Sequence, residues 1–145
     1  MDPVDDKKSF FLHYDTISPR LVSKAVVCSD EKNIIVRAKW DTGATTTCIS
    51  QAVVDALNLE PIGEITVTTS NQVSDAKTYF VDIVLPNNYM CKNTTVIGGQ
   101  INNATHDVLI GMDIIGLGDF AVCNYDGRTS FTFRIPSQEE INFTK

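Results

Sequence analysis

The chain has 145 residues, of which 43% are hydrophobic and 21% are charged, with a net charge of −6. This length and composition predict a single packed domain and exclude a chain that is disordered throughout. The basic residues are few and scattered, which argues against a nucleic-acid partner. No apolar run approaches the roughly 18 residues of a membrane-spanning helix, so we expect no membrane partner.

The N-terminal residues indicate where in the cell the protein is expected, and the cysteines and histidines indicate whether it binds a metal. The N-terminal stretch lacks the basic and apolar regions of a signal peptide, and we therefore expect a cytoplasmic protein. The cysteines include no CxxC pair, and the chain has only two histidines, so we expect no metal site and no cofactor. We expect reduced and mostly buried thiols at Cys28, Cys48, Cys91 and Cys123.

Most of the chain alternates between short runs of strand-forming residues and turn residues, which indicates a mainly β protein. Asp126-Gly127 is a strong signal for a hairpin between the last two strands. In the strand over residues 78–85, the apolar side chains alternate along one face. The predicted strands cover residues 21–28, 33–40, 64–69, 78–85, 93–97, 107–110, 120–124 and 130–135.

Two segments depart from the strand pattern. Ser50 is a good cap for a helix over residues 51–59, and residues 112–115 predict a short helical turn. The buried stripe of the first helix is expected to contain Val53, Val54, Ala56 and Leu57. We divide the chain into an N-terminal arm or edge strand over residues 1–18, a domain over 19–136 and a tail over 137–145.

The segment with the clearest chemical content is Asp41-Thr42-Gly43-Ala44, where an apolar strand delivers an aspartate into a turn. A second segment follows later, Leu109-Ile110-Gly111-Met112-Asp113-Ile114, in which an aliphatic strand ends at glycine and enters a helical turn. Asp-Thr-Gly alone occurs by chance in a few per cent of chains of this length. The two segments together are much less expected by chance than Asp-Thr-Gly alone, so the pair identifies a protein family more specifically than either segment does.

These two motifs together resemble those of the retropepsins, the single-domain aspartic proteases of retroviral type. The resemblance covers about residues 20–136 and is greatest to stand-alone bacterial or cellular members. It implies a mainly β, barrel-like fold with one short helix, acting as a homodimer. It further implies an aspartic endopeptidase that needs no cofactor and takes a peptide or protein substrate.

The chemistry explains why one Asp-Thr-Gly per chain would require two chains. Peptide hydrolysis by this route needs two carboxylates close enough to share a proton, because neighbouring like charges cannot both be ionised. The ionised carboxylate activates a water molecule, and its protonated partner donates to the scissile carbonyl. A two-fold axis would bring Asp41 beside Asp41 of a second copy.

The resemblance assigns roles to the remaining motif residues. Asp41 is the catalytic residue, and Thr42 would brace the two active loops across the dimer axis. Gly43 would place its N–H near the carboxylate, and Ala44 stands where pepsin-like enzymes have serine. The structural motif, Leu109, Gly111 and Asp113, would support the active loop without taking part in the chemistry.

We expect the flap that covers the substrate near residues 66–77, a segment without glycine. Val67 and Val73 of the flap, with Ile110, are the expected lining of an apolar substrate pocket. Lys39 lies two residues before Asp41, so in a regular strand it points to the same side. Residues 10–14 and 131–135 are candidate edge strands for dimerisation.

Two other functions remain open from the sequence. The first is a catalytically silent retropepsin-like module that binds peptides or dimerises, which the unusual flap and Lys39 favour. The second is an unrelated small β-barrel binding protein, monomeric, in which Asp-Thr-Gly is an incidental turn.

Overall fold

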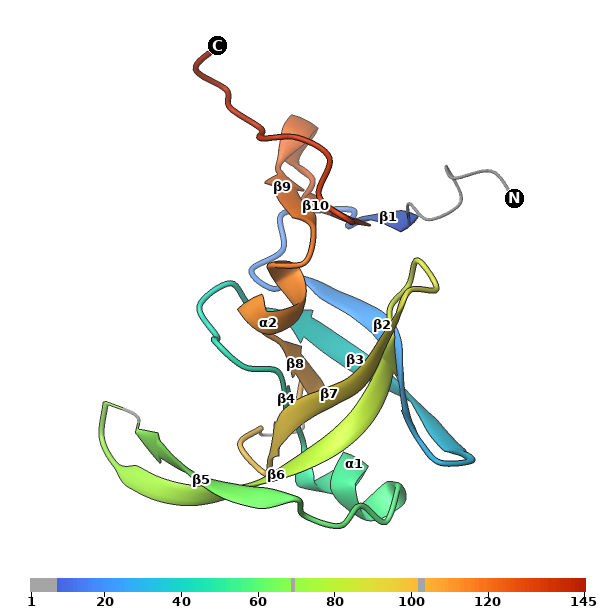
Figure 1. The fold of residues 1–145 in the computed structure, drawn as a ribbon. Helices are drawn as coiled ribbons and strands as arrows, with labels where there is room; N and C mark the ends of the chain where they lie inside the picture. The colour runs from blue at the N-terminus through green and yellow to red at the C-terminus, as the bar shows by residue number, and fades with distance from the viewer. Residues whose placement is uncertain (1–7, 69, 102–103) are drawn as a thin grey trace.

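The computed structural model describes residues 8–68, 70–101 and 104–145 (Figure 1). Within these residues the fold is mainly β, as the sequence predicts, and its strands form two sheets. The larger sheet has the order β2-β3-β8-β4-β7-β6-β5. Its strands are β2 (Val22–Ser29), β3 (Lys32–Trp40), β4 (Cys48–Ile49), β5 (Gly63–Thr68), β6 (Val73–Val84), β7 (Met90–Gly98) and β8 (Val108–Ile110).

The larger sheet closes into a barrel because β2 pairs with β6 as well as with β3. Only β5 lies outside the closed ring, and it extends β6 as a projecting hairpin (Figure 1). The predicted alternation in β6 is confirmed. The apolar side chains on one face of β6, Tyr79, Val81 and Ile83, are all buried, and so is Leu85 directly after the strand. This face and its counterparts on the other strands form the core of the barrel.

The smaller sheet contains β1 (Lys8–His13), β9 (Asp119–Cys123) and β10 (Ser130–Ile135), in the order β1-β10-β9. The predicted hairpin between the last two strands is confirmed, since Asp126 and Gly127 both have positive φ in the turn between them. β10 lies between β1 and β9, so the expectation that residues 131–135 form an edge strand is wrong. β1, from the segment predicted as an arm, is an edge of this sheet.

Trp40 joins the two sheets. Its indole stacks on Phe120 with ring centroids 5.7 Å apart, and it also packs against Phe133 at 5.1 Å and Phe10 at 5.4 Å. Its Nε1–H donates a hydrogen bond to the Ser23 hydroxyl at 2.9 Å in the buried interior. These contacts anchor the end of β3, immediately before Asp41, in the core.

The two helices are short. Ser50 caps α1 (Gln51–Ala56) by accepting the Val53 N–H, as predicted, and Val53, Val54 and Leu57 are buried. Ala56 is exposed, contrary to the prediction, because it lies about 100° around the helix from Leu57, off the face that Val53, Val54 and Leu57 bury. The predicted turn at residues 112–115 is α2 (Met112–Ile115). Neither of these helices is long and apolar enough to span a bilayer.

All four cysteines are free thiols. The expectation that most of them are buried is wrong: Cys91 is buried, Cys28 and Cys48 are half-buried, and Cys123 is exposed. Cys123 is the last residue of β9, an edge strand of the smaller sheet whose final two residues are both exposed.

Candidate active site

Asp41 follows the last residue of β3, where three strands meet. β8 lies between β3 and β4, parallel to the first and antiparallel to the second. The Asp41 N–H donates to the Ile110 carbonyl at 2.9 Å, which continues the β3–β8 ladder by one residue. The loop over residues 41–47 therefore passes around the end of β8 to reach β4.

Three short hydrogen bonds orient the Asp41 carboxylate and its loop. The Gly43 N–H donates to Asp41 Oδ1 at 2.9 Å, and the Ala44 N–H donates to the Asp41 carbonyl at 3.2 Å. The Ala44 carbonyl in turn accepts the Met112 N–H at 2.7 Å. The loop is thus tied to the start of α2, and the half-buried carboxylate is aimed by the backbone.

Gly111 allows the two segments to approach each other closely. A Cβ at this position would lie 2.9 Å from the Ala44 carbonyl oxygen and 2.9 Å from the Thr46 carbonyl carbon. Both are backbone atoms, so no rotamer change can relieve the contact. Glycine at 111 is therefore required for α2 to begin directly beneath the loop that carries Asp41.

Hydrogen bonds between Thr47 and Asp113 also hold the active loop against the start of α2. The Thr47 hydroxyl donates to Asp113 Oδ1 at 2.7 Å, and the Thr47 N–H donates to Oδ2 at 3.0 Å. The same hydroxyl accepts the Gly111 N–H at 3.2 Å. The role of Thr47 was missed from the sequence, since in the run 45–47 three threonines look alike.

A family model described as gag-polyprotein putative aspartyl protease matches residues 31–116 of the chain, a span that holds both Asp41 and the Gly111 segment. The chain belongs to the retropepsin-like aspartic protease family. A search of curated protein sequences gives no match.

Three solved structures are similar to the chain. A retropepsin-like aspartic protease from Rickettsia conorii superposes with a TM-score of 0.60 at 15% identity, covering 89% of this chain and 95% of that one. The simian foamy virus protease gives 0.49 at 18% identity, with 66% and 92% covered. The protein Lpg0085 of unknown function from Legionella pneumophila gives 0.43 at 20% identity, with 65% and 82% covered. The Rickettsia match shows that the retropepsin-like fold extends over most of this chain.

In this retropepsin-like chain Thr42 is exposed beside Asp41. Its side chain makes no hydrogen bond with any other residue that the structure describes. Thr42 lines a cavity of about 600 Å³ together with Met112 and Ile141. The segment after β10 therefore reaches the neighbourhood of the active loop.

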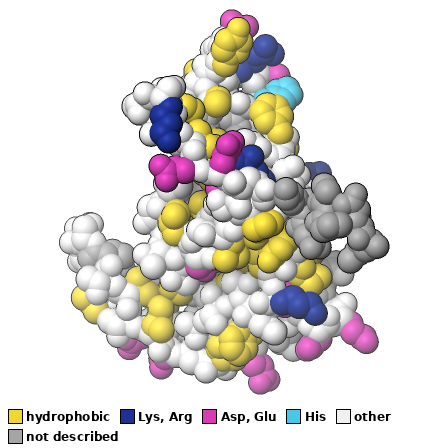
Figure 2. All heavy atoms as spheres, turned by 45° about the horizontal axis from the view of Figure 1, so that its top comes forward, with side chains coloured by type: hydrophobic (Ala, Val, Ile, Leu, Met, Phe, Trp, Pro, Cys, Tyr) yellow, Lys and Arg dark blue, Asp and Glu magenta, His cyan; other side chains and the backbone are white. Residues whose placement is uncertain are grey.

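The expected flap is the β5–β6 hairpin, which projects toward the same side as the loop after β3 in Figure 1. Figure 2 shows the surface hollowed between this hairpin and the body of the molecule. Val67 pairs with Ser74 and Val73 with Thr68, so the two valines lie on opposite faces of the hairpin. They cannot both face a substrate, and Thr69, which the prediction included in the flap, lies outside the described residues.

The expectation that Ile110 lines a substrate pocket is wrong. Its side chain has no exposed surface and lies in the core with Val108. Leu109, between them, is half-buried and points to the other side of β8. All three residues of β8 are aliphatic, so the sequence does not indicate which of them face the core, and the prediction assigned Ile110 to the wrong side.

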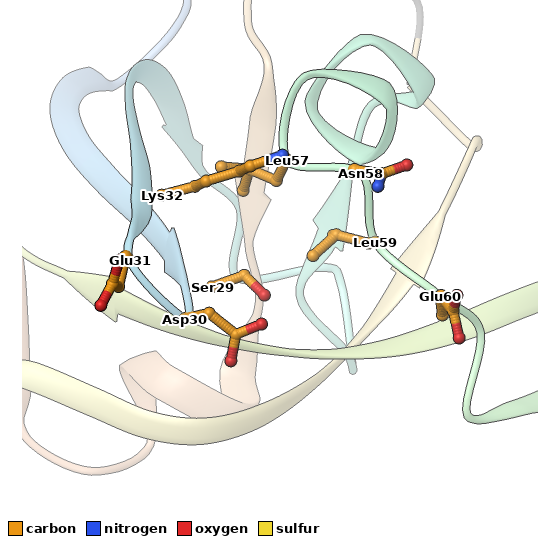
Figure 3. Close-up of a pocket in the computed structure, with 8 residues that line it drawn as sticks. All are labelled: Ser29, Asp30, Glu31, Lys32, Leu57, Asn58, Leu59 and Glu60. Carbon is orange, nitrogen blue, oxygen red and sulfur yellow. The ribbon is translucent and has the colours of Figure 1, made fainter.

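A second cavity, of about 830 Å³, has no residue of the loop over 41–47 in its lining (Figure 3). It is formed by the turn between β2 and β3 and by the residues that follow α1, and its rim carries the carboxylates of Asp30, Glu31 and Glu60. No group of three or more metal-ligating side chains occurs among the described residues, here or elsewhere. We assign this cavity no part in the chemistry.

Cys48 is the thiol nearest to the site. Burial, reinforced by the negative charges of Asp113 and Asp41, raises the pKa of Cys48 to about 11. The thiol is therefore protonated at neutral pH and is a poor nucleophile there. Cys48 is therefore not a candidate nucleophile at this site.

Proposed function

We propose that the chain is an aspartic endopeptidase that acts as a homodimer, with Asp41 of each copy forming the catalytic dyad. The observation that carries this proposal is the Asp41 carboxylate, oriented by the Gly43 N–H on a loop tied to β8 and α2. Family membership supports the same activity. One such loop per chain explains why two copies are needed.

In the proposed mechanism, the two carboxylates share one proton because they cannot both be ionised at close range. The ionised carboxylate takes a proton from a water molecule, which attacks the scissile carbonyl carbon. The protonated carboxyl donates to the carbonyl oxygen, and the resulting tetrahedral intermediate collapses with protonation of the leaving nitrogen. None of these reaction steps uses a metal or a cofactor.

The loop residues have supporting roles in this proposal. The Gly43 N–H holds one oxygen of Asp41, which leaves the other to meet water or the partner carboxylate. The exposed hydroxyl of Thr42 is available to the second copy across the axis. Gly111, Asp113 and Thr47 keep the loop in place and do not touch the substrate.

Substrate would lie extended between the active loops and the β5–β6 hairpin, held mainly through its backbone. The hairpin supports this because its β5 strand is an edge of the larger sheet, with one row of backbone groups unpaired within that sheet. Apolar contacts would come from one face of the hairpin and from Leu109, in place of the buried Ile110.

The test is cleavage of a diverse peptide library, read by mass spectrometry from about pH 3.5 to about pH 7.5. Wild type is compared with Asp41→Asn, and Asp126→Asn serves as the matched control. Asp126 is exposed in the β9–β10 turn with φ 56°, a conformation that asparagine also accepts.

We expect cleavage by wild type and by the Asp126→Asn control, and none by Asp41→Asn. Equal cleavage by all three would mean a contaminant or another catalytic residue, and would contradict the proposal. No cleavage by any of them, with dimers present in the same sample, would favour a silent peptide-binding or dimerisation module.

A further inference from the structure

Positive charge gathers on the outer face of β2 and β3, toward the end that leads into Asp41. In the β2–β3 register Lys24 pairs with Arg37 and Val22 with Lys39, so the three cations lie on one face. Ala38 and Trp40 point into the core. By alternation, Arg37, Lys39 and Asp41 all project to the outer side.

The loop before β8 places Asp107 and His106 beside these cations. The Arg37 guanidinium donates two hydrogen bonds to Asp107, from Nε to Oδ2 at 3.2 Å and from Nη2 to Oδ1 at 3.1 Å. The neighbouring His106 has a lowered pKa, first through burial and then through the positive charges of Lys39, Arg37 and Arg20. His106 is therefore neutral at pH 7, and we call the four neighbouring cations the cationic face: Arg20, Lys24, Arg37 and Lys39.

Lys39 is the member of the cationic face nearest to Asp41 along the chain. Lys39, on β3, pairs with Leu109 on β8, and its side chain is half-buried. Its ammonium forms no ion pair with any carboxylate in the part of the chain that the structure describes, Asp41 included. A half-buried cation without a counterion gains from a carboxylate that binds beside it.

The reach of the side chain suits a substrate that lies over Asp41. Two residues along a strand span roughly 6.6 Å, and a lysine side chain extends a similar distance. The ammonium can therefore meet a side chain within one or two positions of the bond above Asp41. The net charge of the whole chain is −6, so this positive region is a local feature and not a property of the whole surface.

We propose that the cationic face, acting chiefly through Lys39, selects acidic substrates: extended peptides with Glu or Asp within about two residues of the scissile bond. The inference rests on the proposed function, since it places the scissile bond over Asp41. Lys24 adds to the positive potential on this face, and Asp107 holds Arg37 in place while offsetting part of its charge. Lys39 forms the direct ion pair with the substrate carboxylate.

The experiment uses matched peptides that differ only by Glu, Gln or Lys at each position near a cleaved bond. Wild type should prefer Glu over Gln in kcat/KM by about three- to tenfold, and this preference should shrink as salt is raised. Lys39→Met should lose the preference, Lys39→Arg should keep it, and Lys39→Glu should favour the Lys peptide. Lys92→Met, which removes an exposed cation from β7, should behave like wild type.

Cleavage without a Glu preference, or with a preference that Lys39→Met leaves intact, would overturn the inference while the protease assignment stands. Binding of the same labelled peptides to Asp41→Asn, read by fluorescence anisotropy, separates the two claims. A Lys39-dependent Glu preference in binding supports the inference even if no peptide is cleaved. Equal binding of the Glu and Gln peptides overturns it.

Discussion

The side chain of Thr47 donates a hydrogen bond to Asp113 Oδ1 at 2.7 Å and, through the same oxygen, accepts the N–H of Gly111 at 3.2 Å. Thr47 is fully buried, so neither bond competes with water. This one hydroxyl joins the segment that carries Asp41 to the start of α2. The geometry of the candidate active site depends on it.

Replacing Thr47 with valine keeps the shape of the side chain and removes the hydroxyl. We expect the free energy of unfolding to fall by about 1–3 kcal/mol, because the Gly111 N–H is left without its partner and Asp113 loses one donor. Urea denaturation measures the change. Thr46→Val is the control, with an expected effect within about 0.5 kcal/mol. Equal effects of the two substitutions would contradict the role given to Thr47.

Replacing Gly111 with alanine should displace the active loop, because the added Cβ would lie 2.9 Å from backbone atoms of Ala44 and Thr46. We expect a loss of about 1–3 kcal/mol in stability and a larger relative loss of cleavage. The control is Gly127→Ala, which strains a turn with φ +73° but meets no atom within 4 Å. Gly127→Ala should lower the stability of the protein, but it should cleave peptide as fast as wild type when assayed below the Tm of the variant. A Gly111→Ala enzyme with wild-type activity would refute the close approach.

Asp119 accepts hydrogen bonds from the Gln138 N–H at 2.8 Å, the Ser137 hydroxyl at 2.6 Å and Arg134 Nε at 2.8 Å. These bonds hold the pKa of Asp119 well below its usual range. Its stabilising effect is therefore present above the unfolded value of about 3.9 and is lost as the pH falls toward the lower folded value.

We expect Asp119→Asn to have a lower Tm than wild type at pH 7, and the gap to narrow once the pH falls below about 4. Thermal unfolding followed across this pH range makes the comparison. Asp126→Asn, in an exposed turn, should show a small gap at every pH. A gap for Asp119→Asn that stays constant down to pH 2 would exclude a role for the carboxylate charge.

The thiols should differ in their rates of alkylation. Burial raises the pKa of Cys91 and of Cys48 to about 11 from 9.0, which lowers their thiolate fraction near pH 8 by about a hundredfold. Cys123 is exposed and should react first with iodoacetamide. Mass spectrometry of timed digests gives the order, and fast labelling of Cys91 in the folded protein would disagree with its burial.

Local patterns made much of the fold predictable. The period of two in β6 indicated which side chains are buried, and Asp126-Gly127 indicated a turn that needs two positive φ angles. Ser50 indicated the start of α1 because its hydroxyl caps the backbone. Each of these signals acts within a few residues of its own position, so it can be read without the tertiary structure.

The errors concern features that depend on distant parts of the chain. Whether Ile110 or Leu109 faces the core is decided by the place of β8 between β3 and β4, and both residues are aliphatic. Thr47 differs from Thr45 and Thr46 only through its contacts with Asp113 and Gly111. β10 was expected at an edge because no sequence signal indicated that it pairs with β1. The two strands are distant in sequence: Thr132 and Phe10, which are joined by a hydrogen bond, lie 122 residues apart.

The central claim is that catalysis needs one Asp41 from each of two chains. Wild type and Asp41→Asn are mixed at constant total protein, allowed to exchange subunits, and assayed on one cleaved peptide. If the dyad is shared, activity follows the square of the wild-type fraction, so an equal mixture retains about one quarter. Activity that falls in direct proportion to the wild-type fraction would show that each chain works alone, and would contradict the account.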